Sequence, residues 1–294
     1  MRNRHDYSTF GACVQPSEEE SARWWLWPTI LSLDAPIVVV LWQRLLSGSA
    51  RAPASVAASA VLGCSVWLAY AADRWIEGWR LAPHVIRTHR HRFYQQWRWP
   101  VAALWAVVLG ADVWLAEHGL SRPQFVSGLL VLAPVAAYLL SHQLVHRGSP
   151  WRAPKEVCVA VLLGAGAAAF ILAQPDADKE AAALPLGLFV TLCFTNCTLI
   201  SLWEHDVDRS HGQTSLALQF SGVARLGRAL PWLVAALSAA LCGLGLGGTP
   251  AYCAAASAAL LGLVDLAERH TGRMPARVLA DVALMTPVLP LLLR

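Results

Sequence analysis

The chain of 294 residues is 56% hydrophobic and 14% charged, with a mean hydropathy of +0.46 and a formal net charge of +4. Soluble globular proteins carry about 25% charged residues, so this composition indicates a protein that lies mostly inside a lipid bilayer. The small net charge and the scattered basic residues argue against nucleic acid as a partner. The 7 cysteines form no CxxC pair, which argues against a zinc framework.

Apolar runs long enough to span a membrane follow one another along the chain after a polar segment, residues 1–23. A spanning helix needs about 20 mostly apolar residues. Nine stretches meet this condition: 24–46, 54–77, 97–117, 123–146, 155–174, 183–203, 227–247, 250–268 and 277–293. They are continuous rather than alternating with a period of two, which favours helices over a β-barrel. The sequence predicts an all-α integral membrane protein with nine transmembrane helices around a central cavity, in one membrane domain, 24–294.

The basic residues predict the orientation of these helices. If the N-terminus is cytoplasmic, 18 of the 23 Lys and Arg residues fall in cytoplasmic segments. The other five are Arg44, Arg51, Arg122, Lys179 and Arg294. This bias places the long connections 78–96 and 204–226 on the cytoplasmic face of a multi-pass protein of the cytoplasmic membrane.

Two predicted helices end in acidic residues where these long connections begin. Asp73 and Glu77 are four residues apart, as are Glu204 and Asp208, so each pair shares one face of its helix. Like charges at this spacing repel, and the helix dipole disfavours an anion at a C-terminus by about 0.3–1 kcal/mol. We therefore expect a cation to offset both pairs, and Mg²⁺ suits oxygen ligands.

Basic residues follow each acidic pair, and they allow two interpretations. In the simpler one, Arg74, Arg80 and Arg209 pair with the carboxylates as an interfacial salt-bridge cluster. In the other, two Mg²⁺ ions held by the carboxylates are ringed by Arg87, Arg90 and Lys155, and the whole forms a site for a diphosphate. Two such motifs on one face favour the functional interpretation.

The two motifs resemble those of the UbiA-type intramembrane prenyltransferases. That family has nine helices and aspartate-rich motifs at the ends of helices 2 and 6. Its first motif, Asn-Asp-x-x-Asp-x-x-x-Asp with an Arg-Thr continuation, is similar to the stretch from Ala69 to Thr88. Its second, Asp-x-x-x-Asp-x-x-x-Gly, is similar to the stretch from Glu204 to Gly212. The chain departs from the family at Ala69 and Tyr70, which replace the Asn-Asp pair, and at Glu77, Glu204 and His91, which replace two aspartates and a proline.

The resemblance implies an Mg²⁺-dependent transfer of a prenyl group from a prenyl diphosphate to a small acceptor, aromatic or otherwise lipophilic, within the membrane. It implies Asp73 and Asp208 as catalytic residues, and Asp73, Glu77, Glu204 and Asp208 as metal ligands. Arg87, Arg90 and Lys155 would bind the diphosphate, and an apolar tunnel between helices would hold the prenyl chain. A terpene cyclase of the same superfamily, in which the cation closes on its own chain, is equally compatible.

Two other classes of protein remain open. His142 and His146 have the HxxxH spacing of membrane di-iron oxygenases, although no HxxHH motif accompanies it. A transporter or a non-catalytic membrane scaffold would explain the acidic residues in or near apolar segments, which are Asp34, Asp112, Asp265 and Asp281.

Overall fold

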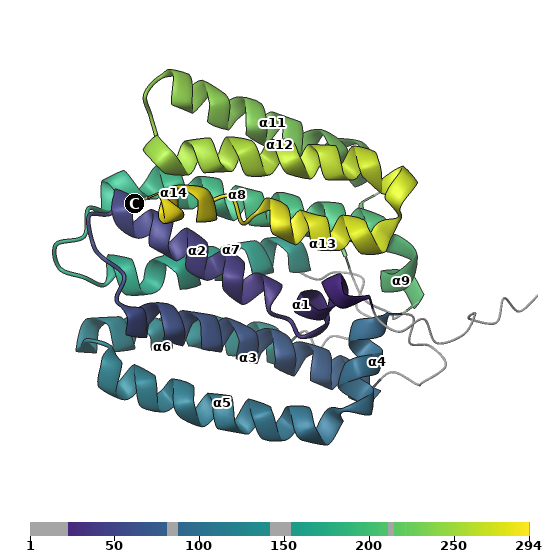
Figure 1. Ribbon diagram of the computed structural model, residues 1–294, viewed down its shortest axis with the longest axis horizontal. Coiled ribbons are helices and arrows are strands. Elements are labelled where there is room, and N and C mark those ends of the chain that lie inside the picture. The colour runs from purple at the N-terminus through teal and green to yellow at the C-terminus, as the bar shows by residue number, and fades with distance from the viewer. Residues whose placement is uncertain (1–22, 81–87, 142–153, 211–214, 221, 294) are drawn as a thin grey trace, which may run out of the picture.

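The computed structural model describes residues 23–80, 88–141, 154–210, 215–220 and 222–293, and this part of the chain is helical, without strands (Figure 1). In chain order the helices are η1 (Trp24–Leu26), α1 (Trp27–Ile30), α2 (Asp34–Ser49), α3 (Val56–Arg80), α4 (His89–Gln96), α5 (Arg98–Gly119), α6 (Arg122–Leu140), α7 (Lys155–Leu172), α8 (Lys179–Trp203), α9 (His205–Ser210), α10 (Leu216–Gln219), α11 (Val223–Gly243), α12 (Gly248–Thr271), α13 (Arg273–Ala283) and α14 (Val288–Leu292).

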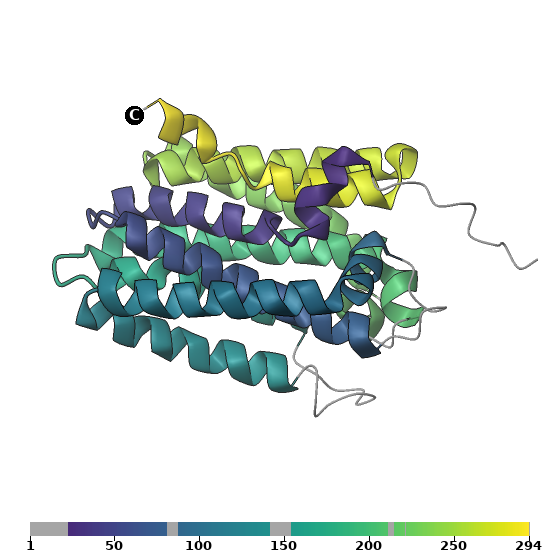
Figure 2. The same ribbon diagram turned by 60° about the horizontal axis from the view of Figure 1, so that its bottom comes forward.

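The long helices run side by side in one bundle. Helices α2, α7 and α8 lie between the pair α11 and α12 on one side and the group α3, α5 and α6 on the other (Figures 1 and 2). The short helices α4 and α9, which belong to the two long connections, lie at the same end of the bundle (Figure 1). The two acidic motifs therefore end at the same end of the bundle.

Seven helices of the described chain are long and apolar enough to cross a bilayer, by length and composition. The bent pair Trp24–Ile30 and Asp34–Ser49 would make an eighth span. Large apolar side chains such as Leu104, Val107 and Leu130 point outward from α5 and α6, where lipid would cover them. The protein is thus a helical membrane protein, as the sequence predicts, but the nine spans and the orientation of the N-terminus are not confirmed.

The first predicted span, 24–46, is not a continuous helix. Its two halves are bent by 75° at a break around Ser32, whose φ is 58°, in the left-handed region. The Leu31 carbonyl at the break accepts a hydrogen bond of 3.0 Å from the Trp67 indole. The Tyr94 hydroxyl also donates to the Ser32 hydroxyl at 3.1 Å. Such partners are needed wherever a helix breaks at membrane depth.

The last predicted span, 277–293, is also interrupted, between α13 and α14. Pro287 has no N–H to continue the helix begun by α13, so the chain turns after Ala283. The Leu284 carbonyl freed there accepts a 2.9 Å hydrogen bond from the indole of Trp42, which is fully buried in α2. The Trp42 ring also stacks on Phe189 of α8 at 5.0 Å, so the break is fixed to the centre of the bundle.

Candidate functional site

The first acidic motif lies at the end of α3, where α4 crosses it closely. A side chain at Gly78 would place its Cβ 3.2 Å from the backbone nitrogen of Gln95, so glycine permits this approach. The crossing places the Glu77 Oε2 atom 2.7 Å from His91 Nε2 and 3.5 Å from an Arg74 Nη1. Both Glu77 and His91 are buried.

His91 is neutral in this arrangement. Burial lowers its pKa to about 4, and the hydrogen bond with Glu77, which acts in the opposite direction, does not offset that effect. A neutral ring has one N–H, so we assign it to Nε2, which donates to Glu77, while Nδ1 accepts from the Thr88 hydroxyl at 2.5 Å. Thr88, His91 and Glu77 therefore form one hydrogen-bonded chain that fixes α4 to the end of α3.

The second acidic motif begins where α8 ends. Glu204 is the residue that caps α8, and its carbonyl accepts from the Asp208 amide at 2.8 Å, which keeps the one-turn spacing into α9. The Glu204 Oε2 atom accepts from Arg90 Nη2 at 3.0 Å and from Arg277 Nη1 at 2.8 Å. Burial alone would raise the pKa of Glu204, but the charges of Arg277 and Arg90 hold it well below its usual range.

Asp208 pairs with a different cation. Its Oδ2 atom lies 3.0 Å from the Lys155 ammonium at the start of α7, and the Asp208 side chain is almost completely buried. Next to Lys155, the buried Glu156 carboxylate accepts from the Leu216 amide at 3.0 Å, which holds α10 to the same end of α7. Helix α10 is therefore tied to the end of α7 that carries Lys155.

Arg277 is a site residue that the sequence analysis did not single out. It lies on α13, far along the chain from both motifs, and in the sequence it is only one of the 18 basic residues that predict the orientation. No local pattern marks it, because its partner Glu204 belongs to a distant helix. Arg74, Arg90 and Arg277 line the same cavity, and burial together with the nearby charges of Arg277 and Arg74 lowers the pKa of Arg90 to about 10.

Of the other predicted site residues, the structure describes Asp73 but not Arg87. Asp73 lies one turn before Glu77 and lines the same cavity as Arg90 and Lys155. Arg87 lies outside the described residues, so its predicted role stays a prediction. The same is true of His142 and His146, on which the oxygenase alternative depends.

The acidic residues considered for an ion path each have a local partner. Asp34 accepts from the Ala35 amide at 2.9 Å, and Asp112 accepts from the Ser65 hydroxyl at 2.7 Å. Asp265 accepts from the Trp203 indole at 3.0 Å, and Asp281 accepts from the Asn196 amide at 3.0 Å. These contacts join α3 to α5, α8 to α12 and α8 to α13, which gives three of the four carboxylates a role in helix packing.

A cavity of about 650 Å³ connects the charged residues to the apolar interior of the bundle. The charged end is lined by Asp73, Arg74, Glu77, Arg90, Lys155, Glu156, Glu204, Asp208 and Arg277. Much of the remainder is lined by apolar side chains of α3, α5, α6 and α7, among them Leu62, Val66, Leu109, Leu132, Leu163 and Phe170. The cavity can therefore accommodate a molecule with a charged head and an apolar tail.

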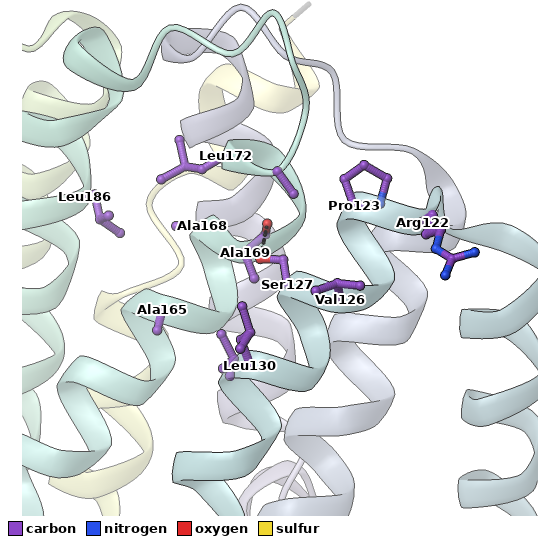
Figure 3. A pocket seen from close by; sticks show the side chains of 12 residues that line it. Arg122, Pro123, Val126, Ser127, Leu130, Ala165, Ala168, Ala169, Leu172 and Leu186 are labelled. Atoms are coloured by element: carbon purple, nitrogen blue, oxygen red, sulfur yellow. Dashed lines mark hydrogen bonds between the residues drawn. The ribbon is translucent and has the colours of Figure 1, made fainter.

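A second hollow, of about 780 Å³, lies between α6 and α7 and is open to the outside (Figure 3). Pro123, Val126 and Leu130 face Ala165, Ala168 and Leu172 across it, so its lining is almost entirely apolar. None of the motif residues lines this groove, which has the character of a lipid-facing surface rather than of a reaction site.

In the described part of the chain, three of the four carboxylates predicted to hold Mg²⁺ are engaged by other side chains. No group of three or more His, Cys, Asp or Glu side chains in this part of the chain comes close enough together to hold a metal ion. Glu77, Glu204 and Asp208 are instead engaged by His91, by two arginines and by Lys155. Ala69 and Tyr70 supply no carboxylate in the positions where the family has its Asn-Asp pair. The Mg²⁺ dependence therefore stays a prediction from the resemblance alone.

Comparison with known proteins bears on the fold. No protein-family model matches the sequence, and no curated protein matches it. A solved structure, the apo structure of a UbiA homolog from Aeropyrum pernix K1, is similar over 89% of this chain and 98% of that chain, with a TM-score of 0.57 and 19% sequence identity. The expectation of a UbiA-type fold, drawn from the acidic motifs, is thereby confirmed: the chain is a multi-pass membrane protein with the fold of a UbiA homolog, at low sequence identity.

Proposed function

We propose that the protein is an intramembrane prenyltransferase. It binds a prenyl diphosphate with the diphosphate at the charged end of the cavity and the prenyl chain along the apolar part, and it transfers the prenyl group to a small, lipophilic acceptor. The observation that carries this proposal is the 650 Å³ cavity, because it joins a charged end, which includes Arg74, Arg90, Lys155 and Arg277, to a lining of apolar side chains.

The reaction needs charge stabilisation at the diphosphate. The bond between the allylic carbon and the diphosphate oxygen breaks, and the electron pair leaves with the oxygen. Arg90 and the Lys155 ammonium are close enough to the charged end to stabilise that developing charge. The allylic carbon then bonds to the acceptor, which releases a proton. In this scheme Asp208 holds Lys155 at the cavity, and Asp73, which lines the charged end, is the second catalytic carboxylate and accepts the proton that the acceptor releases.

The proposal assigns no step to Mg²⁺, because Glu77, Glu204 and Asp208 are engaged by other side chains of the protein. It places the charged end of the cavity on the cytoplasmic side of the membrane, since the bias of the Lys and Arg residues favours that orientation. Arg87 would add a further positive charge there.

The proposal is tested with the purified protein in detergent and a labelled prenyl diphosphate. We expect release of diphosphate and a labelled lipophilic product that depends on an added acceptor. Release with a cyclic hydrocarbon product and no need for an acceptor would favour the terpene cyclase. Absence of both release and binding would contradict the proposed function.

A further inference from the structure

Two guanidinium groups converge on one carboxylate at the charged end of the cavity. Arg90 and Arg277 both donate to the same oxygen of Glu204, at 3.0 Å and 2.8 Å. The side chains of the three residues are only 10%, 16% and 13% exposed, so little water reaches them. Both arginines thus share a single acceptor atom, although other carboxylates line the same end of the cavity. The case for a further ligand here therefore depends on hydrogen-bond donors that the protein leaves unused rather than on net charge.

The hydrogen-bonding capacity of these arginines also exceeds what the protein supplies. Each guanidinium has five N–H donors, and each uses one terminal nitrogen for Glu204. The Nε atoms of Arg90 and Arg277 are buried and have no partner among the described residues. A ligand with several negatively charged oxygens would supply the acceptors that Glu204 alone does not.

Arg74 adds a third guanidinium to the same end of the cavity. It approaches Glu77 at 3.5 Å, which is too long for a strong hydrogen bond, so it keeps donors for a ligand. Glu77 has its closer contact with His91, at 2.7 Å. Arg74, Arg90 and Arg277 come from α3, α4 and α13, and all three line the cavity.

We propose that Arg74, Arg90 and Arg277 hold the diphosphate of the ligand directly, and that this binding requires no divalent ion. Glu204 is then a positioning residue, which keeps Arg90 and Arg277 together at the cavity. The inference rests on the proposed function, since it concerns how the same site takes its diphosphate. Guanidinium groups suit this role because they bind phosphate oxygens through two parallel hydrogen bonds.

The first test uses the unaltered chain in phospholipid-free detergent, with farnesyl diphosphate as the probe. We expect the same rise in melting temperature in EDTA as in Mg²⁺, since a ligand of the folded state stabilises it. Stabilisation that needs Mg²⁺ would overturn the inference but leave the proposed function standing. Stabilisation in neither condition would contradict both. Inorganic diphosphate should compete with the probe in EDTA, and failure to compete would mean that the arginines do not hold the head group.

The second test compares two arginines of the same helix. Arg277→Ala should weaken binding of farnesyl diphosphate in EDTA about tenfold or more, because it removes a positively charged side chain that donates hydrogen bonds. Arg273→Ala is the matched control, since Arg273 lies on α13 but is exposed and does not line the cavity. Equal affinity of the two variants would overturn the role of Arg277.

The third test distinguishes a positioning residue from a metal ligand. Glu204→Gln removes a negative charge beside two arginines but keeps an oxygen that accepts hydrogen bonds. If the arginines hold the diphosphate, the affinity in EDTA is retained or increased; if Glu204 binds a metal, the affinity in Mg²⁺ falls. Should this variant not fold, the comparison of EDTA with Mg²⁺ on the unaltered chain decides the question by itself.

Discussion

Arg90 in α4 and Glu204 at the end of α8 are joined by a hydrogen bond of 3.0 Å. The residues belong to the two long connections, which the sequence separates by four predicted spans. Their contact brings both acidic motifs to one end of the bundle and gives them a common cavity. A site made of both motifs is possible only in this arrangement.

The first prediction concerns the side of the membrane on which the connections lie. Reporter fusions after Arg92, in α4, and after Gln219, in α10, should report the same side, and that side should be cytoplasmic. A fusion at Asp176, between α7 and α8, should report the opposite side, because α7 ends there after crossing the bundle. Opposite results for Arg92 and Gln219 would be incompatible with the contact between Arg90 and Glu204.

The second prediction separates Asp208 from a neighbouring acidic residue. Asp208→Asn removes the charge that holds Lys155 at 3.0 Å, and it should reduce prenyl transfer by about 100-fold or more. Asp206→Asn is the control, since the Asp206 side chain is 86% exposed and should change stability by less than about 0.5 kcal/mol. The measurement is the initial rate of diphosphate release for each variant. An equal loss of rate in both variants would show that the acidic residues act only through their total negative charge, and not through the contact between Asp208 and Lys155.

The third prediction is a loss of stability in mild acid that depends on His91. The folded state holds the pKa of His91 at about 4, against an ordinary value of 6.5. Between these values the unfolded chain binds a proton that the folded chain does not, so stability is complete above pH 6.5 and falls as the pH falls towards 4. The full effect corresponds to about 3 kcal/mol at most.

This dependence is measured by urea or thermal unfolding in detergent across that pH range. The control is His91→Gln, which keeps a side chain able to hydrogen-bond to Glu77 but does not titrate. The variant should be less stable at neutral pH and should show a flatter profile between pH 6.5 and 4. A profile as steep as that of the unaltered chain would assign the effect to other groups.

The fourth prediction concerns the break in the last membrane segment. Trp42→Phe removes the indole N–H that donates to the Leu284 carbonyl and leaves this acceptor buried without a partner, which costs about 1–3 kcal/mol. Trp114→Phe is the control, because Trp114 is 61% exposed on α5 and faces outward. Thermal unfolding of the two variants should differ clearly, and similar melting temperatures would mean that the hydrogen bond contributes little.

The sequence predicts the long apolar helices well, because each of them is a continuous run of the length that a bilayer requires. It does not predict the breaks at Ser32 and after Ala283. Pro36 and Pro287 are visible in the sequence, but prolines also occur inside intact helices here, as Pro134 and Pro185 do in α6 and α8. A break is tolerated only where distant side chains such as Trp67 and Trp42 satisfy the exposed backbone groups.

The candidate site, like the fold, can be predicted from the sequence only in part. The acidic residues at the two helix ends are visible as pairs with a spacing of four, and the sequence predicts that they share one face. It does not reveal which side chains they contact, because Arg277 and His91 are brought to Glu204 and Glu77 by the packing of α13 and α4. The sequence therefore identifies the carboxylates, and their partners depend on the folded bundle.

The distribution of the arginines has a consequence for how the protein is made. Helices enter the membrane in chain order, so α8 and its Glu204 are inserted before α13 exists. Of the two arginines that contact Glu204, only Arg90 is then present, and the second bond forms when α13 docks against α8. Completion of the cavity is in this way linked to the insertion of α13, and a chain truncated before α13 would lack the arginine that closes its charged end.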